Sequence, residues 1–161
     1  MRPAGEPAAP LPSGAGFRFA IIVSRFNADI TESLREAAKA ALVEAGVASA
    51  NLEEFTVPGA FELPQAARCA AETGRFDAIV CLGCVIRGET PHFEYVASSA
   101  AQGLMAASGD TGVPMAFGVL TTDTEEQAKV RAGADEHNKG REAAAAALEM
   151  ATLFRSLGVK R

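Results

Sequence analysis

The sequence predicts a single α/β domain, a three-layer sandwich in which a four-stranded parallel sheet is flanked by helices on both faces. Four short runs are largely apolar, which is the pattern of strands buried on both sides. The longer segments between them place apolar residues along one helical face. Because strand and helix patterns alternate through the 161 residues, neighbouring strands should run parallel.

The predicted strands differ in their surroundings. The third is an almost uninterrupted apolar run from Ala78 to Ile86, so it should be central. The second starts as an alternation at Leu52 and is broken by Pro58 and Gly59. In chain order, the strands are predicted over 17–23, 52–57, 78–86 and 115–120.

Start and stop signals set the predicted helices. Asp29 stands three residues before Glu32, the spacing of a capping box, and Gly46 is placed to end the same helix. Pro64 is tolerated in the second helix because it lies in the first turn. The helices are predicted over 29–45, 61–73, 93–107, about 122–131 and 139–157.

Two boundaries depend on local signals alone. Residues 109–114, with the sequence GDTGVP, predict a turn between the third helix and the fourth strand. Thr122 and Asp123 precede Glu125 and Glu126 by three residues each, which predicts that the fourth helix starts there.

The N-terminal segment differs in composition from the rest. Residues 1–16 contain four prolines and three glycines, which exclude a helix and make poor strand material. We expect an extended or mobile arm over 1–16, followed by one domain over 17–161.

Composition excludes several classes of function. A net charge of −5, the absence of a basic run and of Trp, and a single Tyr argue against nucleic-acid binding. No apolar run is long enough to span a membrane. The odd number of cysteines, three, and an N-terminus without an apolar centre predict reduced thiols in the cytoplasm.

Cys81 and Cys84 form a literal C-x-x-C, which can indicate a redox pair or half a zinc site. Redox pairs lie at a helix N-terminus, whereas this pair lies within a predicted strand. Residues three apart on a strand point to opposite faces. We therefore interpret both as structural thiols and expect no metal.

Three loops leave the carboxyl ends of the predicted strands, where ligands bind in folds of this kind. Phe26 can stack on a flat ring, and Asn27 and Glu62 can hydrogen-bond a polyol or the edge of a heterocycle. The third loop offers backbone N–H groups for an anion, the Thr90 hydroxyl and the His92 imidazole, a group that commonly titrates near neutrality. The loops are residues 25–27, 58–62 and 87–92.

Several motifs along the chain occur together in one known family. In order and spacing, SRFN, VPGAFELP, GCVIRGETPHFEYV, FGVLTTDTEEQA, RAG, NKG and EMATL resemble 6,7-dimethyl-8-ribityllumazine synthase. The resemblance extends from about Phe17 to Leu157. The combination of RGETPH with the downstream RAG and NKG is specific, whereas RFN alone would be weak. The resemblance implies a flavodoxin-like fold.

The resemblance also implies an activity. The family condenses 5-amino-6-(D-ribitylamino)uracil with 3,4-dihydroxy-2-butanone 4-phosphate, releasing phosphate and water, in the penultimate step of riboflavin biosynthesis. Such a transferase uses no metal and no organic cofactor. Two alternatives stay open: a flavodoxin-like module that binds flavin or lumazine without turnover, and a cage protein that encloses a partner.

Site residues follow from the matching motifs. The resemblance implies that Phe26 stacks on the pyrimidine and that His92 transfers protons. The other implied contacts are Asn27, Gly59, Ala60 and Glu62 for the ribityl chain, Phe61 beside them, the backbone of Val85 and Ile86 at the ring, Gly88, Glu89, Thr90 and Arg131 for phosphate, and Phe117 and Lys139 from a neighbouring subunit.

Six of these residues also have simpler interpretations. Phe26 and Phe61 could belong to the core, and His92 alone could be an ordinary histidine of a loop or helix start. Glu62 could serve only the positive end of its helix. Lys139 could be an exposed charge at a helix start. Arg131, taken alone, would be a solvated cation at a helix end.

An oligomer is expected because Phe117, within the fourth strand, and Arg131, near the end of the next helix, do not obviously reach the three loops of their own subunit. The resemblance implies a pentamer, and in some members twelve pentamers close into an icosahedral capsid of 60 subunits, which can enclose riboflavin synthase. The short connection 133–140 favours the capsid, although its Asp-Glu-His centre departs from the small and basic residues common there. The prolines of the arm disfavour an added strand.

Overall fold

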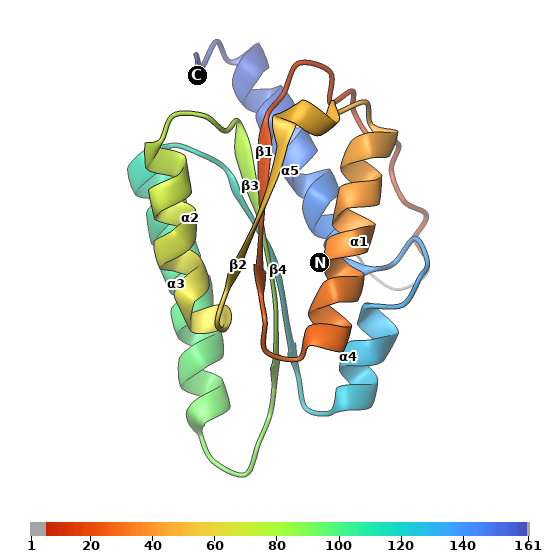
Figure 1. The fold of residues 1–161 in the computed structure, drawn as a ribbon, viewed down its shortest axis with the longest axis vertical. Coiled ribbons are helices and arrows are strands. Elements are labelled where there is room, and N and C mark those ends of the chain that lie inside the picture. Colours follow the sequence, from red (N-terminus) through yellow and green to blue (C-terminus); the bar gives the residue numbers. More distant parts are fainter. Residues whose placement is uncertain (1–5, 161) are drawn as a thin grey trace.

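The computed structural model describes residues 6–160 and contains one parallel sheet with the strand order β2-β1-β3-β4 (Figure 1). Strands β1 and β3 are central, and β2 and β4 form the edges. The elements, in chain order, are β1 (Phe19–Ser24), α1 (Ala28–Glu44), β2 (Leu52–Val57), α2 (Leu63–Glu72), β3 (Ala78–Ile86), α3 (His92–Thr111), β4 (Met115–Thr122), α4 (Glu125–Arg131) and α5 (Lys139–Ser156), with short 3-10 segments at Ser49–Asn51 and Ala60–Glu62.

Helices cover both faces of this sheet, which confirms the predicted three-layer α/β sandwich (Figure 1). Helices α1, α4 and α5 pack on one face, and α2 and α3 pack on the other. Alternate residues of β1 and β3 enter the two cores, so both strands are buried along almost their whole length. Cys81 lies in one core and Cys84 in the other, as the interpretation as structural thiols requires. Burial raises the pKa of the Cys81 thiol to about 12.

The start of α1 differs from the prediction. No capping box forms at Asp29, because the helix already begins at Ala28. Asn27 precedes it with φ 58° and ψ 52°, and its side chain makes no capping bond. Instead, the Asn27 amide donates to the carbonyl of Cys84 at 3.1 Å, so it ties the loop to β3. Asparagine is one of the few residues that tolerate this left-handed conformation.

Two further boundary predictions were wrong. Helix α3 continues through Gly109, Asp110 and Thr111, and the turn begins only at Gly112, with φ 70°. An ion pair from Arg68 of α2 to Asp110, at 3.0 Å, ties the last turn of α3 to α2. Helix α4 starts after Thr124, whose hydroxyl accepts the N–H of Gln127, so the cap lies later than the prediction placed it.

The described part of the predicted arm lies against its own chain. Residues 6–16 form neither helix nor strand. The Gly14 N–H donates to the carbonyl of Ala45 at 2.7 Å, and Leu11 packs against the core. Phe17 belongs to this turn, because its N–H donates to Gly14, and β1 therefore starts at Phe19. Residues 1–5 of the predicted arm lie outside the described residues.

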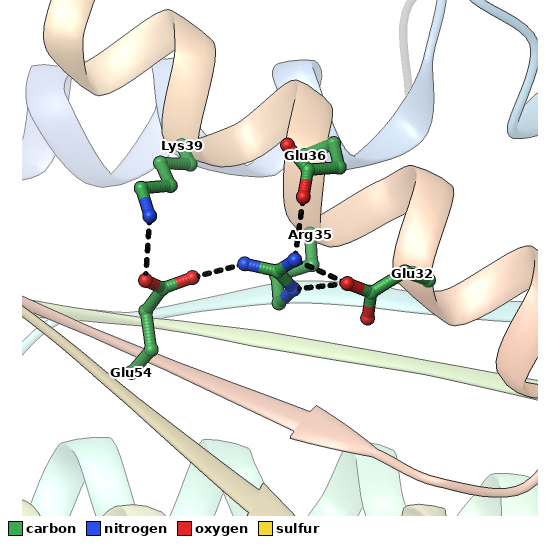
Figure 2. Close-up of polar contacts among 5 residues, drawn as sticks. All are labelled: Glu32, Arg35, Glu36, Lys39 and Glu54. Carbon is green, nitrogen blue, oxygen red and sulfur yellow. Dashed lines mark hydrogen bonds and ion pairs between the residues drawn. The ribbon is translucent and has the colours of Figure 1, made fainter.

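An ion-pair network fixes the edge strand β2 to α1 (Figure 2). The carboxylate of Glu54 accepts from Arg35 at 2.5 Å and from Lys39 at 2.8 Å, and Arg35 also pairs with Glu32 and Glu36. Partial burial would raise the pKa of Glu54, but the bonds from Lys39 and Arg35 outweigh it and leave the pKa below its ordinary value.

Replacing Glu54 with glutamine should lower the free energy of unfolding at pH 7 by less than about 1 kcal/mol, because solvent screens this surface network. The lowered pKa means that Glu54 stabilises the fold above its unfolded-state pKa and loses that contribution as the pH falls through the folded-state pKa. Urea unfolding of both proteins at pH 7 and near pH 3 should show the difference only at pH 7. Glu149→Gln is the matched control, since Glu149 is exposed and makes no ion pair among the described residues.

Candidate functional site

A pocket of about 480 Å³ opens where the loops after β1, β2 and β3 meet the start of α3. This volume is within the range of small-molecule sites. It lies at the carboxyl ends of the strands, as predicted, on the face of the sheet that α2 and α3 cover. Nine of the predicted site residues line it: Phe26, Asn27, Gly59, Ala60, Phe61, Glu62, Val85, Ile86 and His92.

Two exposed phenylalanine rings flank the pocket. The side chains of Phe26 and Phe61 are 70% and 60% exposed, values that are unusual for apolar side chains of this size. The core interpretation of Phe26 and Phe61 is therefore wrong. A flat ligand could pack on either ring and remove that surface from water.

The loop after β2 holds its shape through its own hydrogen bonds. Glu62 accepts the N–H of Gly59 at 2.9 Å, so one carboxylate oxygen serves the start of this helical segment, as the simpler interpretation proposed. The same residue lines the pocket, so the two roles coexist. Gly59 is buried, and a Cβ there would lie 3.1 Å from the Phe26 ring and 3.2 Å from Glu62. A Cβ at this position would therefore require the side chain of Phe26 or Glu62 to move by a few tenths of an ångström.

The loop between β3 and α3 leaves backbone donors free. None of the N–H groups of Gly88, Glu89 and Thr90 donates a hydrogen bond within residues 6–160. All three residues are exposed, and they lie outside the lining of the pocket. His92 is the first residue of α3 and does line the pocket. Free N–H groups that precede a helix of 20 residues form a surface that favours anions.

Three lining residues were missed by the sequence analysis: Cys84, Tyr95 and Val96. Tyr95 and Val96 follow His92 by three and four residues, so on a helix they share its face. That spacing was a signal available in the sequence. Cys84 is the last fully buried residue of β3, two residues before the strand ends, and only its place beside the loops brings it to the pocket.

Three predicted residues lie away from this pocket. Phe117 pairs with Cys81 on the edge strand β4, whereas Thr121 and Thr122 are the residues that pair with the lining Val85 and Ile86. Cys84, which also lines the pocket, pairs with Leu120, so Phe117 is three residues along the strand from the level of the pocket, roughly 10 Å. Arg131 ends α4, which covers the opposite face of the sheet, and its guanidinium donates to the carbonyl of Gln127.

The third of them, Lys139, lies between two residues that have structural tasks. Asn138 is buried and caps α5, because its Oδ1 accepts the N–H groups of Gly140 and Arg141, while its Nδ2 donates to Gly133. Gly140 packs on α1 so closely that a Cβ would lie 2.0 Å from the carbonyl oxygen of Leu34. The ammonium of Lys139, mostly shielded from solvent, pairs with Glu142 at 2.9 Å. Two of the three residues of the NKG motif therefore serve the fold.

The described residues contain no group of three or more His, Cys, Asp or Glu side chains that could hold a metal ion. Over the same residues, no helix is long and apolar enough to cross a membrane.

Comparison with known proteins agrees with the geometry. The family model for 6,7-dimethyl-8-ribityllumazine synthase matches residues 16–155. A 6,7-dimethyl-8-ribityllumazine synthase of Salinibacter ruber (strain DSM 13855 / M31) is 54% identical over 145 residues, 88% of this chain and 91% of the relative. Another, from Syntrophus aciditrophicus (strain SB), is 52% identical over 142 residues, 88% of this chain and 92% of the relative. This chain, with its strand-end pocket and its anion-favouring loop, belongs to the 6,7-dimethyl-8-ribityllumazine synthase family.

Proposed function

We propose that this chain condenses 5-amino-6-(D-ribitylamino)uracil with 3,4-dihydroxy-2-butanone 4-phosphate in the strand-end pocket, as a transferase of riboflavin biosynthesis. The observation that carries the proposal is the convergence of Phe26, Phe61 and His92 on one pocket beside a loop with free N–H groups. An exposed aromatic pair suits the flat pyrimidine, and the loop suits the phosphate.

The pyrimidine substrate takes the side of the pocket formed by the loops after β1 and β2. Its ring stacks on Phe26, with the backbone of Val85 and Ile86 at its edge. The ribityl hydroxyl groups bond the polar groups of Asn27, Gly59, Ala60 and Glu62. These residues already lie together in the free chain, so little ordering is required when the substrate binds.

The butanone phosphate takes the opposite side, with its phosphate on the N–H groups of Gly88, Glu89 and Thr90. The primary amine of the pyrimidine attacks the ketone and loses water to form a Schiff base. Phosphate then leaves as an anion, and a second condensation closes the ring with loss of another water. Each step moves a proton, and we assign this transfer to His92, which begins α3 and lines the pocket. Holding the two substrates together supplies much of the acceleration.

The site is completed by a neighbouring subunit. Phe117, Arg131 and Lys139 lie away from the pocket of their own chain, and Arg131 is on the far face of the sheet. Repeated head-to-tail contact around a closed ring would bring one subunit's Arg131 to the phosphate loop of the next. We therefore propose a homo-pentamer with one site at each contact.

Arg131→Ala should raise the Michaelis constant for the butanone phosphate by about tenfold, because it removes a charge-assisted hydrogen bond to phosphate. The Michaelis constant for the pyrimidine should change much less. Steady-state kinetics with each substrate varied in turn measure both values. Lys129→Ala is the matched control, since Lys129 is an exposed cation on the same helix. A normal constant for the butanone phosphate in the Arg131 variant would reject the phosphate assignment.

Mixed oligomers test the shared site directly. His92→Ala and Arg131→Ala subunits are co-expressed with different tags and co-purified. If the two residues belong to different subunits, roughly a quarter of the contacts in a random ring carry both intact residues and recover activity. Both variants keep some activity, so the assay uses butanone phosphate well below its Michaelis constant and compares the mixture with the mean of its two components. A shared site should make the mixture several-fold faster than that mean, whereas two residues of one subunit should leave it equal to the mean.

The proposal extends to a capsid of pentamers, to an enclosed partner enzyme and to a location in the cytoplasm. The connection from Ala132 to Asn138 is short and closed by its own hydrogen bonds, which supports a 60-subunit capsid built from pentamers. Light scattering separates this from a free pentamer. Riboflavin synthase is a candidate for the enclosed partner, to be detected by co-purification. The three free cysteines suit a reducing compartment, the cytoplasm.

A further inference from the structure

Arg87 stands between the end of β3 and the phosphate loop, the segment from Gly88 to Pro91. It is the first residue after the strand and immediately precedes Gly88. Its backbone N–H donates to the carbonyl of Thr122 at 2.8 Å, so the sheet ladder to β4 extends one residue past β3. The position of the loop is therefore fixed at its first residue.

The Arg87 side chain joins three elements. Its Nε donates to Asp123, in the turn between β4 and α4, at 2.7 Å, and its guanidinium pairs with Glu94, in the first turn of α3, at 3.3 Å. The same guanidinium lies over the Phe93 ring, 4.6 Å from the ring centroid. These contacts raise the pKa of Arg87, chiefly through the bond to Asp123, so the charge is permanent.

These contacts hold both ends of the phosphate loop. Phe93 and Glu94 directly follow His92, so the guanidinium fixes the helix start that carries the imidazole. The loop from Gly88 to Pro91 spans the gap between the backbone of Arg87 and the helix that its side chain holds. A cation with two carboxylate partners is also largely neutralised, which makes it a poor phosphate ligand.

We propose that Arg87 is a positioning residue, which sets the phosphate loop and the start of α3 through Asp123 and Glu94 without touching the phosphate. This inference rests on the proposed function, because it assigns the same loop to the butanone phosphate. It also predicts whether phosphate binding becomes tighter or weaker when Asp123 is replaced. If Arg87 bound phosphate itself, removing the competing carboxylate of Asp123 would tighten phosphate binding, whereas a positioning role makes the same change weaken it.

The test compares Arg87→Ala, Arg87→Lys, Asp123→Asn and the Arg87→Ala/Asp123→Asn double variant in the full-length oligomer. Calorimetric titration with inorganic phosphate gives binding without turnover, and steady-state kinetics give the Michaelis constants. Arg87→Ala and Asp123→Asn should each weaken phosphate binding and raise the Michaelis constant for the butanone phosphate by about tenfold. The double variant should be no worse than Arg87→Ala alone, because removing the arginine already breaks its contact with Asp123. Lysine should recover only part of the loss, since it lacks the planar fork.

Arg68→Ala is the matched control. Arg68 is an exposed arginine of α2 with two carboxylate partners. Glu72 lies on the same helix, and Asp110 lies in the last turn of α3, far from His92. It should change thermal stability as Arg87→Ala does and leave phosphate binding unchanged. Tighter phosphate binding by Asp123→Asn, additive effects in the double variant, or normal phosphate binding by Arg87→Ala would each overturn the inference. A wild-type protein that binds phosphate but makes no lumazine from the two substrates would instead reject the proposed function.

Discussion

Replacing His92 with alanine is expected to lower kcat by about a hundredfold, the usual loss when one general acid–base group is removed. Turnover should persist, because in the proposed site Phe26 and the loops over residues 58–62 and 88–91 still hold the two substrates together. Schiff-base formation proceeds between amines and ketones without an enzyme, so orientation alone retains part of the catalysis. The Michaelis constants should change little, since the phosphate is bound by other groups.

Lumazine fluorescence measures this turnover. His137→Ala is the matched control, because His137 is the chain's other histidine and lies in the connection between α4 and α5. Added imidazole should partly rescue the His92 variant and leave the His137 variant unaffected. A kcat within twofold of the wild type would show that another group transfers the proton. A complete loss of turnover with intact assembly would show that holding the substrates together does not catalyse the reaction without His92.

Gly140→Ala is expected to be the most destabilising single-methyl change in α5, with a loss of about 3 kcal/mol in the free energy of unfolding. A Cβ at this position would lie 2.0 Å from the carbonyl oxygen of Leu34 and 2.7 Å from its carbonyl carbon. Both atoms belong to the backbone of α1, so no side chain can move aside. Helix α5 would have to shift from α1, which would disturb the buried cap at Asn138.

Urea unfolding monitored by circular dichroism measures the loss. Gly109→Ala supplies the opposite control, because Gly109 lies within α3 and a Cβ there would meet nothing within 4 Å. Alanine at that position should stabilise the protein by about 0.5–1 kcal/mol, through the entropy that glycine loses on folding. Equal unfolding midpoints for the two variants would show that α1 and α5 adjust freely at their contact.

The strands and the layer order were predictable because burial on both faces leaves a strong apolar signal. The second and third strands were predicted over the observed ranges. Helix ends were less predictable, because a local signal can be overruled by a distant partner. Asn27, which precedes α1, bonds to Cys84, 57 residues away, instead of capping the helix. The tie from Arg68 to Asp110 accompanies the extra turn of α3.

The pocket was partly predictable for a similar reason. Strand-end loops are visible in a sequence, so Phe26, Glu62 and His92 were found. Tyr95 and Val96 were not predicted because they lie beyond the loop, on the helical face that His92 begins. The proposed roles of Arg131, Phe117 and Lys139 depend on contacts between subunits. The structure of one chain therefore shows where these residues lie but not what they contact in a neighbour.

The NKG segment has a consequence for how the family is recognised. Asn138 closes the first turn of α5, and Gly140 permits the contact with α1, so both are required before any substrate arrives. A paralogue that had lost its catalytic role would still need both residues to fold. The motif thus reports shared ancestry and architecture, whereas under the proposed mechanism the histidine that begins α3 reports chemistry. When uncharacterised paralogues are sorted into enzymes and bare scaffolds, the residue at the position of His92 is the more informative one to read.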